Sequence, residues 1–175
     1  MSFPRRAGVE IRTARLVLRQ PRADDLRAIV EACQDPDIPR FIPFVPTPYG
    51  EDDAHAFLAA VEREWQGSET RTFAICEADD VLAGAVTVRL REGGTVGYWL
   101  RASARGHGLM TEAVRAVVQW ARDEHGIERL FLWTHPDNHA SQAVAERVGF
   151  VRLGLAEHAP AFQDGTTVGV KFELA

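Results

Sequence analysis

The fold is decided by residues 95–125, which read TVGYWLRASARGHGLMTEAVRAVVQWARDEH. Residues 95–100 read as a strand. From about residue 111 to residue 124, apolar positions recur at i, i+3, i+4 and i+7 and face a polar side, which predicts an amphipathic helix. Gly126 follows as a C-terminal stop. A strand, a glycine-rich turn and a helix therefore follow one another.

The sequence after this helix supplies a second strand. Residues 130–133 (Leu-Phe-Leu-Trp) are apolar and predict a buried strand. Strand, helix and strand in this order make a βαβ unit, so the two strands should be parallel. The polar stretch Thr134-His135-Pro136-Asp137-Asn138-His139-Ala140-Ser141 then lies at the carboxyl end of the second strand, where ligands gather in such sheets.

The remaining elements extend outward from this unit on both sides. Hydrophobic periodicity and turn residues predict helices beginning near residues 24–25 and spanning 51–66 and 138–148, and strands at 11–20, 72–76, 81–90, 150–155 and 168–174. The order predicts a mixed α/β fold with helices on both faces of the sheet. A chain of 175 residues suits one domain, so we expect residues 1–175 to form a single domain.

The segment from residue 36 to residue 50 contains five prolines among aromatic and aliphatic residues. The prolines exclude a long helix or a central strand, and the aromatic side chains exclude a fully solvated linker. Two interpretations stand at equal weight: the wall of a binding site, or a loop packed over the core.

The glycine-rich turn has the chemistry of an anion site. Gly106 and Gly108 would let the backbone approach a phosphate, and the helix that follows presents free N–H groups and a partial positive charge. Nearby basic side chains add positive charge within an acidic protein, namely Arg101, Arg105, His107 and Arg115. By itself, a Gly-x-Gly turn serves strand-to-helix geometry as often as it binds a ligand.

Several phosphate ligands are disfavoured by the motif itself. No Gly-Lys-Ser/Thr follows, which excludes a P-loop. A dinucleotide fingerprint needs a third glycine, where this chain has Thr111, and an acidic residue after the second strand, where it has Thr134 and His135. Asn138 and Ser141 lie three residues apart at a helix start, where Asn138 can cap the helix or bond a ligand.

Taken together, these motifs resemble the GNAT N-acetyltransferase superfamily. Arg105-x-x-Gly108-x-Met110 resembles its acetyl-CoA pattern Gln/Arg-x-x-Gly-x-Gly/Ala, from which Met110 departs. Three further stretches resemble the RimJ/RimL-like branch (ribosomal-protein-alanine N-acetyltransferases and relatives), namely residues 13–19 (Thr-Ala-Arg-Leu-Val-Leu-Arg), Asn138-His139-Ala140-Ser141 and residues 146–150 (Glu-Arg-Val-Gly-Phe). The resemblance covers nearly the whole chain in order.

The resemblance implies a GNAT-like fold and a binding mode. It implies a mixed, mostly antiparallel sheet of about seven strands, whose parallel fourth and fifth strands splay to admit the pantetheine arm of acetyl-CoA. The cofactor-binding residues would be Tyr98, Trp99 and Leu100 along the arm, Arg105, Gly106, His107, Gly108, Met110 and Thr111 at the pyrophosphate, and Asn138.

The resemblance also implies a direct transfer of the acetyl group to a primary amine. A backbone N–H near Leu100 would stabilise the oxyanion, and Ser141 would protonate the departing thiolate. The amine must lose a proton. For that base the sequence offers Glu157, with His158, Asp164 and Glu92 as further candidates, while Glu112 suits the helix dipole better.

Bulk properties exclude several classes of partner. A formal charge of −5 disfavours nucleic acid and anionic membranes, and no run is long and apolar enough to span a bilayer. Residues 1–6 lack the apolar stretch of a secretory signal, and two cysteines are too few for a disulfide framework, so we expect a cytoplasmic protein. His135, Asp137 and His139 lack a third strong ligand, so no metal is expected.

Three hypotheses follow. The first is an acetyl-CoA-dependent N-acetyltransferase acting on a protein N-terminus or a small amine, and the family is compatible with a homodimer. The second is a non-catalytic acyl-CoA-binding module, or an acyltransferase with a larger donor such as succinyl-CoA. The third is a nucleotide-dependent oxidoreductase. In the first, residues 36–50 and 155–168 would shape the acceptor pocket.

Overall fold

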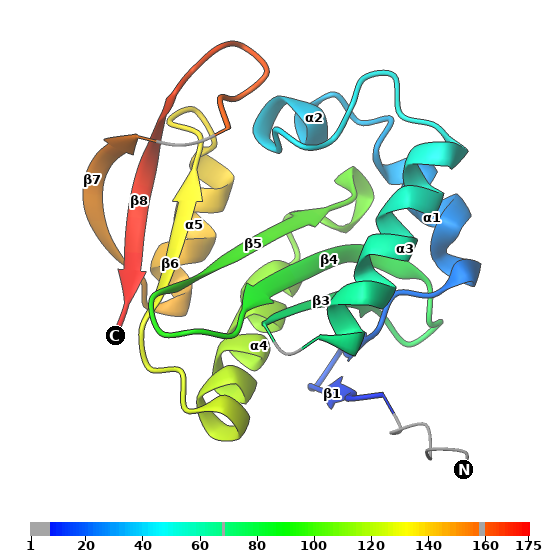
Figure 1. The fold of residues 1–175 in the computed structure, drawn as a ribbon, viewed down its shortest axis with the longest axis horizontal. Coiled ribbons are helices and arrows are strands. Elements are labelled where there is room, and N and C mark those ends of the chain that lie inside the picture. The colour runs from blue at the N-terminus through cyan, green and yellow to red at the C-terminus, as the bar shows by residue number, and fades with distance from the viewer. Residues whose placement is uncertain (1–7, 68, 158–159) are drawn as a thin grey trace.

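The protein is described by a computed structural model over residues 8–67, 69–157 and 160–175. Within these residues the strands form one eight-stranded sheet in the order β1-β2-β3-β4-β5-β6-β8-β7 (Figure 1). Neighbouring strands are antiparallel except for β5 (Gly94–Leu100) and β6 (Leu130–Thr134), which are parallel. The predicted mixed, mostly antiparallel sheet is confirmed. The predictions for residues 1–6 and His158 lie outside the described residues.

The N-terminal part of the sheet corrects one predicted element. Residues 11–20 do not form one strand but a short hairpin of β1 (Ile11–Arg12) and β2 (Val17–Arg19). Thr13 makes the turn, because its N–H donates to the Leu16 carbonyl and its hydroxyl accepts from the Leu16 N–H, both at 3.0 Å. Eight strands therefore replace the predicted seven, and the predicted fourth and fifth strands are β5 and β6.

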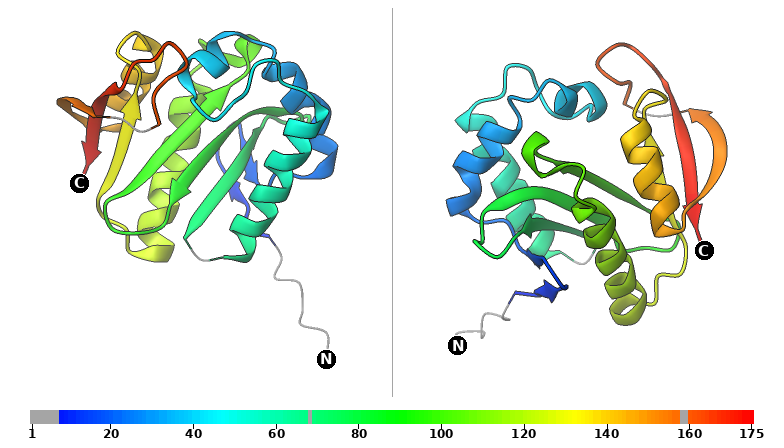
Figure 2. Two further views of the ribbon diagram at one scale, coloured as in Figure 1. Left: turned by 45° about the horizontal axis from the view of Figure 1, so that its top comes forward. Right: turned by 180° about the vertical axis from the view of Figure 1, so that it is seen from behind.

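The centre of the sheet is a meander of β3 (Thr70–Cys76), β4 (Leu82–Arg89) and β5. Alternate residues of these strands point to opposite faces. Phe73, Ile75, Val86 and Val88 belong to one hydrophobic cluster with α4 (Leu109–His125). Ala74 and Cys76 belong to another with α1 (Leu26–Ala32) and α3 (Glu51–Gln66). Helices therefore cover both faces, as predicted, with α3 in front and α4 behind in the left-hand view of Figure 2.

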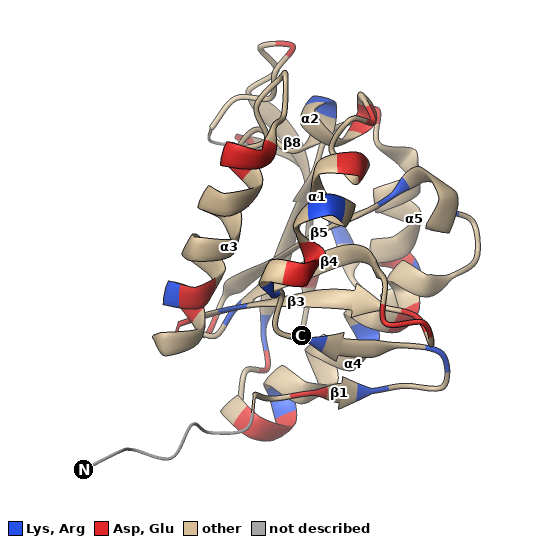
Figure 3. Ribbon diagram, turned by 90° about the vertical axis from the view of Figure 1, so that its right-hand side faces the viewer, with Lys and Arg blue, Asp and Glu red and all other residues tan. Residues whose placement is uncertain are grey.

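Three helix ends lie where the sequence places their signals. Gly126 and Gly149 adopt left-handed conformations (φ 65° and 113°) after α4 and after α5 (His139–Val148). Asn138 caps α5 by accepting from the Ser141 N–H at 3.0 Å. Three acidic residues occupy the first turn of α3, where the helix dipole favours them (Figure 3). No helix in the described part of the chain is long and apolar enough to cross a membrane.

The parallel pair opens soon after it forms. β5 and β6 pair only at Gly94–Leu130 and Thr95–Phe131, so the rest of both strands diverges. β6 then pairs with β8 (Val168–Leu174), which pairs with β7 (Val151–Glu157) at the edge of the sheet. The predicted splay is confirmed, and it leaves an opening between the two halves of the sheet (Figure 1).

Candidate functional site

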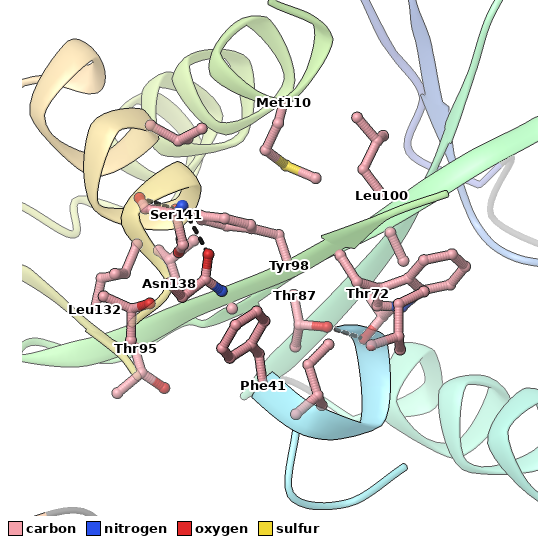
Figure 4. Close-up of a pocket in the computed structure, with 18 of the residues that line it drawn as sticks. Phe41, Thr72, Thr87, Thr95, Tyr98, Leu100, Met110, Leu132, Asn138 and Ser141 are labelled. Carbon is pink, nitrogen blue, oxygen red and sulfur yellow. Dashed lines mark hydrogen bonds between the residues drawn. The ribbon is translucent and has the colours of Figure 1, made fainter. Parts of the chain in front are cut away.

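A cleft of about 2240 Å³ passes through the opening between β5 and β6. On the α4 face it is lined by the glycine turn and by α4 and α5. On the α3 face it is lined by threonines of β3 and β4 and by aromatic residues of the segment 36–50, including Phe41 and Tyr49. Figure 4 shows Ser141 and Met110 on one side of β5, and Thr87 and Phe41 on the other. The cleft therefore gives access to the strand from two directions.

The glycine turn has the backbone that its residues require. Gly106 and Gly108 adopt φ angles of 81° and 76°, which side chains rarely tolerate, and Gly108 is the N-cap of α4. A Cβ at Gly106 would meet nothing within 4 Å, so open space lies beside this backbone. Helix α4 begins at Leu109, two residues earlier than predicted, so Met110 and Thr111 lie in its first turn and line the cleft.

The positive charge at this mouth comes partly from residues other than those predicted. Arg105 lines the cleft, but its guanidinium lies 2.7 Å from Asp35 and its Nε donates to the Leu100 carbonyl. The side chains of Arg101 and His107 are not among those that line the cleft. Arg115 does line it, and the described residues add Arg15, Arg122 and Arg147.

Arg15 is the residue that sequence reasoning missed at this turn. It reaches from the β1–β2 hairpin to donate to the His107 carbonyl at 2.8 Å and to Glu112 at 2.7 Å. Burial raises the pKa of Glu112, but hydrogen bonds from Thr13 and Arg15 outweigh this effect and lower the pKa overall. Glu112 therefore anchors the hairpin to the first turn of α4, in a structural role. The sequence signal for Arg15 is the pattern Arg-Leu-x-Leu-Arg at residues 15–19. Its partner Glu112 lies 97 residues away, so the pattern does not reveal the contact.

The three β5 residues predicted to contact the cofactor arm differ in the direction of their backbone groups. The Arg101 N–H donates to the Ala83 carbonyl of β4 at 2.9 Å. Because backbone groups of successive strand residues point to opposite edges, Trp99 bonds toward β4. Tyr98 and Leu100 point their backbone groups into the opening. Two of the three residues thus have backbone groups facing the cleft, whereas Trp99 lines it with its side chain.

Ser141 and Tyr98 meet at the edge of the opening. The Ser141 hydroxyl donates to the Tyr98 hydroxyl at 3.1 Å, and the Tyr98 hydroxyl donates to the Ser141 carbonyl at 3.1 Å. Burial raises the pKa of Tyr98 to about 12, with the bond to Ser141 opposing the shift. Asn138 lies beside them and also lines the cleft (Figure 4). No sequence pattern indicates the Tyr98–Ser141 pair, because the partners are 43 residues apart.

Two loops close over the α3 side of the cleft, which we call the acceptor loops: residues 36–50, which include the short helix α2 (Asp37–Phe41), and residues 160–167. His135, at the end of β6, joins them. It is 3% exposed, and its ring contacts Phe41 and Phe162 at centroid distances of 5.5 and 4.8 Å. The Gln163 amide also donates to the Val45 carbonyl at 2.7 Å.

The histidine that suggested a metal has other partners. His135 Nδ1 accepts from the Asp137 N–H at 3.0 Å, which leaves Nε2 to carry the proton and donate to Asp164 at 3.0 Å. Within the part of the chain that the structure describes, no group of three or more His, Cys, Asp or Glu side chains could hold a metal ion. Nε2 of His135 therefore holds the loop 160–167 through Asp164, and Nδ1 holds the backbone turn at Asp137.

The base candidates are separated by the fold. Glu157 ends β7 and lines the cleft. Glu92 lies beside Arg129 at the closed end of the β5–β6 pair, away from the cleft, and Asp164 bonds to His135 and to the Thr166 N–H. Sequence reasoning also missed Glu64, Thr72 and Thr87, which line the α3 side of the cleft. Spread over a helix and two strands, they form no sequence motif.

Comparisons with known proteins agree with this geometry. A family model described as an acetyltransferase (GNAT) domain matches residues 15–151. YjcK of Bacillus subtilis (strain 168), named a probable N-acetyltransferase, is 37% identical over 84 residues, which are 45% of this chain and 46% of YjcK. The ribosomal-protein-serine acetyltransferase of Escherichia coli (strain K12) is 28% identical over 90 residues, 49% of this chain and 50% of that protein. This chain thus spans about half the length of either relative.

Among solved structures, the chain is similar to RimL, a ribosomal L7/L12 alpha-N-protein acetyltransferase in complex with coenzyme A. The TM-score is 0.83, with 19% sequence identity over 94% of this chain and 97% of that one. At this identity the likeness establishes the fold.

Proposed function

Since this chain belongs to the acetyltransferase (GNAT) domain family, we propose that it transfers an acetyl group from acetyl-CoA to a primary amine. The observation that carries this proposal is the opening between β5 and β6, with a left-handed glycine turn at one mouth and the Tyr98–Ser141 pair at its edge. A thioester arm laid along β5 and an amine arriving from the α3 side would meet there.

The residues of the α4 mouth fit a pyrophosphate. The space beside Gly106 is open, so an anion could contact the backbone where a Cβ would otherwise project. The first N–H groups of α4 point toward this mouth, and a helix N-terminus favours negative charge. Arg115 and Arg147 supply balancing charge in a protein of net charge −5. When bound there, acetyl-CoA supplies the activated acyl group.

Residues of this chain would orient the reaction and move its protons. The backbone groups of Tyr98 and the N–H of Leu100 face the opening and can pair with the amides of the arm, and a free N–H there can stabilise an oxyanion. The Leu100 carbonyl accepts from Arg105. Ser141 would give its hydroxyl proton to the leaving sulfur. Glu157 lines the cleft and is a candidate to accept the proton of the amine. Asn138 would hold the cofactor from the start of α5.

We propose a protein N-terminus as the acceptor. The names of the ribosomal-protein-serine acetyltransferase and of RimL suggest this class. The cleft also supports it, because its α3 side is lined by aromatic residues of both acceptor loops, which can pack against an extended chain end. A small-molecule amine is the alternative, and the assay described next compares peptides with such amines.

The proposal is tested in two steps. Thermal shift with acetyl-CoA, CoA, succinyl-CoA and NAD identifies the ligand, and we expect the CoA compounds to stabilise the protein. If NAD alone did so, the oxidoreductase hypothesis would replace this one. Thiol release is then measured with a hexapeptide beginning with Ser, one beginning with Ala, spermidine and an aminoglycoside. Tight acetyl-CoA binding without turnover on any amine would favour a non-catalytic binding module.

A further inference from the structure

Three side chains form a hydrogen-bonded chain that leads away from the α3 side of the cleft. Thr87 of β4 lies 2.8 Å from Thr72 of β3, measured between the two hydroxyl oxygens. The Thr72 hydroxyl donates to Glu64 Oε2 of α3 at 2.7 Å. Figure 4 shows the Thr87–Thr72 bond beside β5. All three residues line the cleft.

The chemistry of the three groups fixes the direction of this chain. A carboxylate can only accept hydrogen bonds, so the single proton of Thr72 must point to Glu64. Thr72 can then only accept from Thr87, whose own proton is used in that bond. The remaining lone pair of Thr87 is free to accept a further proton. The chain thus runs from an acceptor at Thr87 to a carboxylate at Glu64.

The free end of this chain lies where an amine would approach. Thr87 pairs in register with Gly97 of β5, the strand that borders the opening. A Cβ at Gly97 would meet nothing within 4 Å, so the space beside Thr87 is open. Gly97 directly precedes Tyr98, whose hydroxyl bonds to Ser141. The Thr87 hydroxyl therefore faces the cleft next to the place where the acyl group would lie.

The far end of the chain reaches solvent by another route. Glu64 is half-buried, and it also borders a small surface pocket with Gly67, Glu69 and Thr70. Thr72 is 2% exposed, so the middle of the chain is shielded from water. Arg71 is the charged neighbour, and its guanidinium donates to the Glu64 backbone carbonyl at 2.9 Å. Burial lowers the pKa of Arg71, and the charge of Glu64 opposes that effect.

We propose that Thr87, Thr72 and Glu64 relay the proton of the acceptor amine away from the place where the amine attacks. This inference rests on the proposed acetyltransferase function. The ammonium proton passes to Thr87 as the Thr87 proton passes to Thr72 and the Thr72 proton to Glu64. The products are a neutral amine, two unchanged hydroxyls and a protonated Glu64, which releases the proton to solvent. The amine lone pair then attacks the thioester, without any covalent bond to the enzyme.

The test separates proton acceptance from hydrogen bonding. Glu64→Gln keeps an oxygen that can accept from Thr72 but cannot take up the proton. Thr87→Val keeps the shape of the side chain and removes its hydroxyl, whereas Thr87→Ser keeps the hydroxyl and serves as the matched control. With a Ser-starting hexapeptide we expect Glu64→Gln and Thr87→Val to lower kcat/KM about tenfold or more at pH 6.5. We expect Thr87→Ser, which retains the hydroxyl, to recover most of the kcat/KM that Thr87→Val loses.

The pH profile distinguishes a relay from a structural role. An α-amino group has a pKa of about 7.7–8.0, so at pH 9.5 most of the peptide is already neutral. The deficits of Glu64→Gln and Thr87→Val should therefore shrink to within about threefold at that pH, whereas damage to the fold would persist. The affinity for CoA and the affinity for the peptide in the presence of CoA, both by calorimetry, should stay within about threefold of wild type.

The outcomes are distinguishable from failure of the proposed function. If the wild type turns over no amine, the acetyltransferase proposal fails. If it turns over the peptide while Glu64→Gln and Thr87→Val match it across the pH range, the relay is wrong. A large loss confined to Glu157→Gln under the same conditions would overturn the relay in favour of that carboxylate.

Discussion

The Tyr98 hydroxyl is joined to Ser141 by two hydrogen bonds across the edge of the cleft, one to the Ser141 hydroxyl and one to its carbonyl, each 3.1 Å long. Tyr98 donates to the Ser141 carbonyl, so the Ser141 hydroxyl can donate only to the oxygen of Tyr98 within this pair. The arrangement fixes the rotamer of Ser141 from a strand on the opposite side of the opening. Because Tyr98 lies on β5 and Ser141 on α5, the orientation of Ser141 depends on how far β5 and β6 diverge.

Replacing Ser141 should affect turnover more than binding. Ser141→Ala removes the proposed proton donor but leaves the helix cap at Asn138, which uses the backbone N–H of residue 141. We expect kcat to fall roughly 10–100-fold, because general acid catalysis contributes effects of this order or larger. The affinity for acetyl-CoA, measured by calorimetry, should change little. Equal losses in kcat and affinity would argue against the acid role.

Tyr98→Phe tests the positioning of Ser141 separately. The variant keeps the ring and removes both hydrogen bonds, so Ser141 gains rotational freedom. We expect a smaller fall in kcat than for Ser141→Ala, and little further loss in the double variant because both act through the same group. Additive losses would show that Tyr98 acts on its own.

The glycine turn should be sensitive to a side chain beyond the cost of backbone strain. Gly106→Ala places a Cβ in the open space at a φ of 81°, where an L-residue is strained by about 1–2 kcal/mol. Gly126→Ala imposes similar strain (φ 65°) at the far end of α4, also with nothing within 4 Å. We expect similar losses in thermal stability, but a loss of CoA affinity of about tenfold or more only for Gly106→Ala. Equal CoA affinities would place the pyrophosphate elsewhere.

Stability should depend on pH through Glu112. The pKa of this carboxyl is lowered in the folded protein, so the stabilisation is present above its unfolded value and is lost as the pH falls through the folded value. Glu112→Gln should therefore lower the free energy of unfolding by about 1 kcal/mol at pH 7. The difference should vanish in acid, below both pKa values. Urea unfolding at pH 7 and at a series of falling acidic pH values measures this.

The control for Glu112 is an exposed ion pair. Glu31 bonds to Arg27 four residues earlier on α1, at the surface. Exposed pairs of this kind contribute little, so Glu31→Gln should change the free energy of unfolding by less than about 0.5 kcal/mol at either pH. A similar dependence in both variants would mean that general charge effects, and not the link from α4 to the hairpin, govern the acid transition.

Loosening the acceptor loops should weaken amine binding selectively. Asp164→Ala removes the acceptor of the His135 Nε2 proton. His135 lies between the two loops, with its ring against Phe41 and Phe162. We expect KM for the peptide to rise about 3–10-fold, as loss of one hydrogen bond would give, with the affinity for CoA unchanged. Asp164→Asn keeps an oxygen that can accept from His135 and should behave like the wild type. A rise in KM for Asp164→Asn as well would point to the charge.

The sequence alone determined the strand–turn–helix at residues 95–125, the parallel partner at β6, the caps at Gly126, Asn138 and Gly149, and the resemblance to the family. These features depend on local signals: hydrophobic period, glycine conformation and short motifs. Residues 11–20 were the exception, because the turn at Thr13 depends on a threonine hydroxyl that accepts from the Leu16 N–H within an otherwise strand-like pattern.

Only the tertiary structure decided which side chains meet in the cleft. Arg15 bonds to Glu112 across 97 residues, Tyr98 to Ser141 across 43, and Thr87 reaches Glu64 through Thr72 on a neighbouring strand. Such contacts depend on strand register and on the angle at which β5 and β6 diverge. A sequence pattern records the period of each element but not the position of one element against another. The glycine turn of the site can therefore be predicted from the sequence, whereas the groups proposed to move protons are brought together only by tertiary packing.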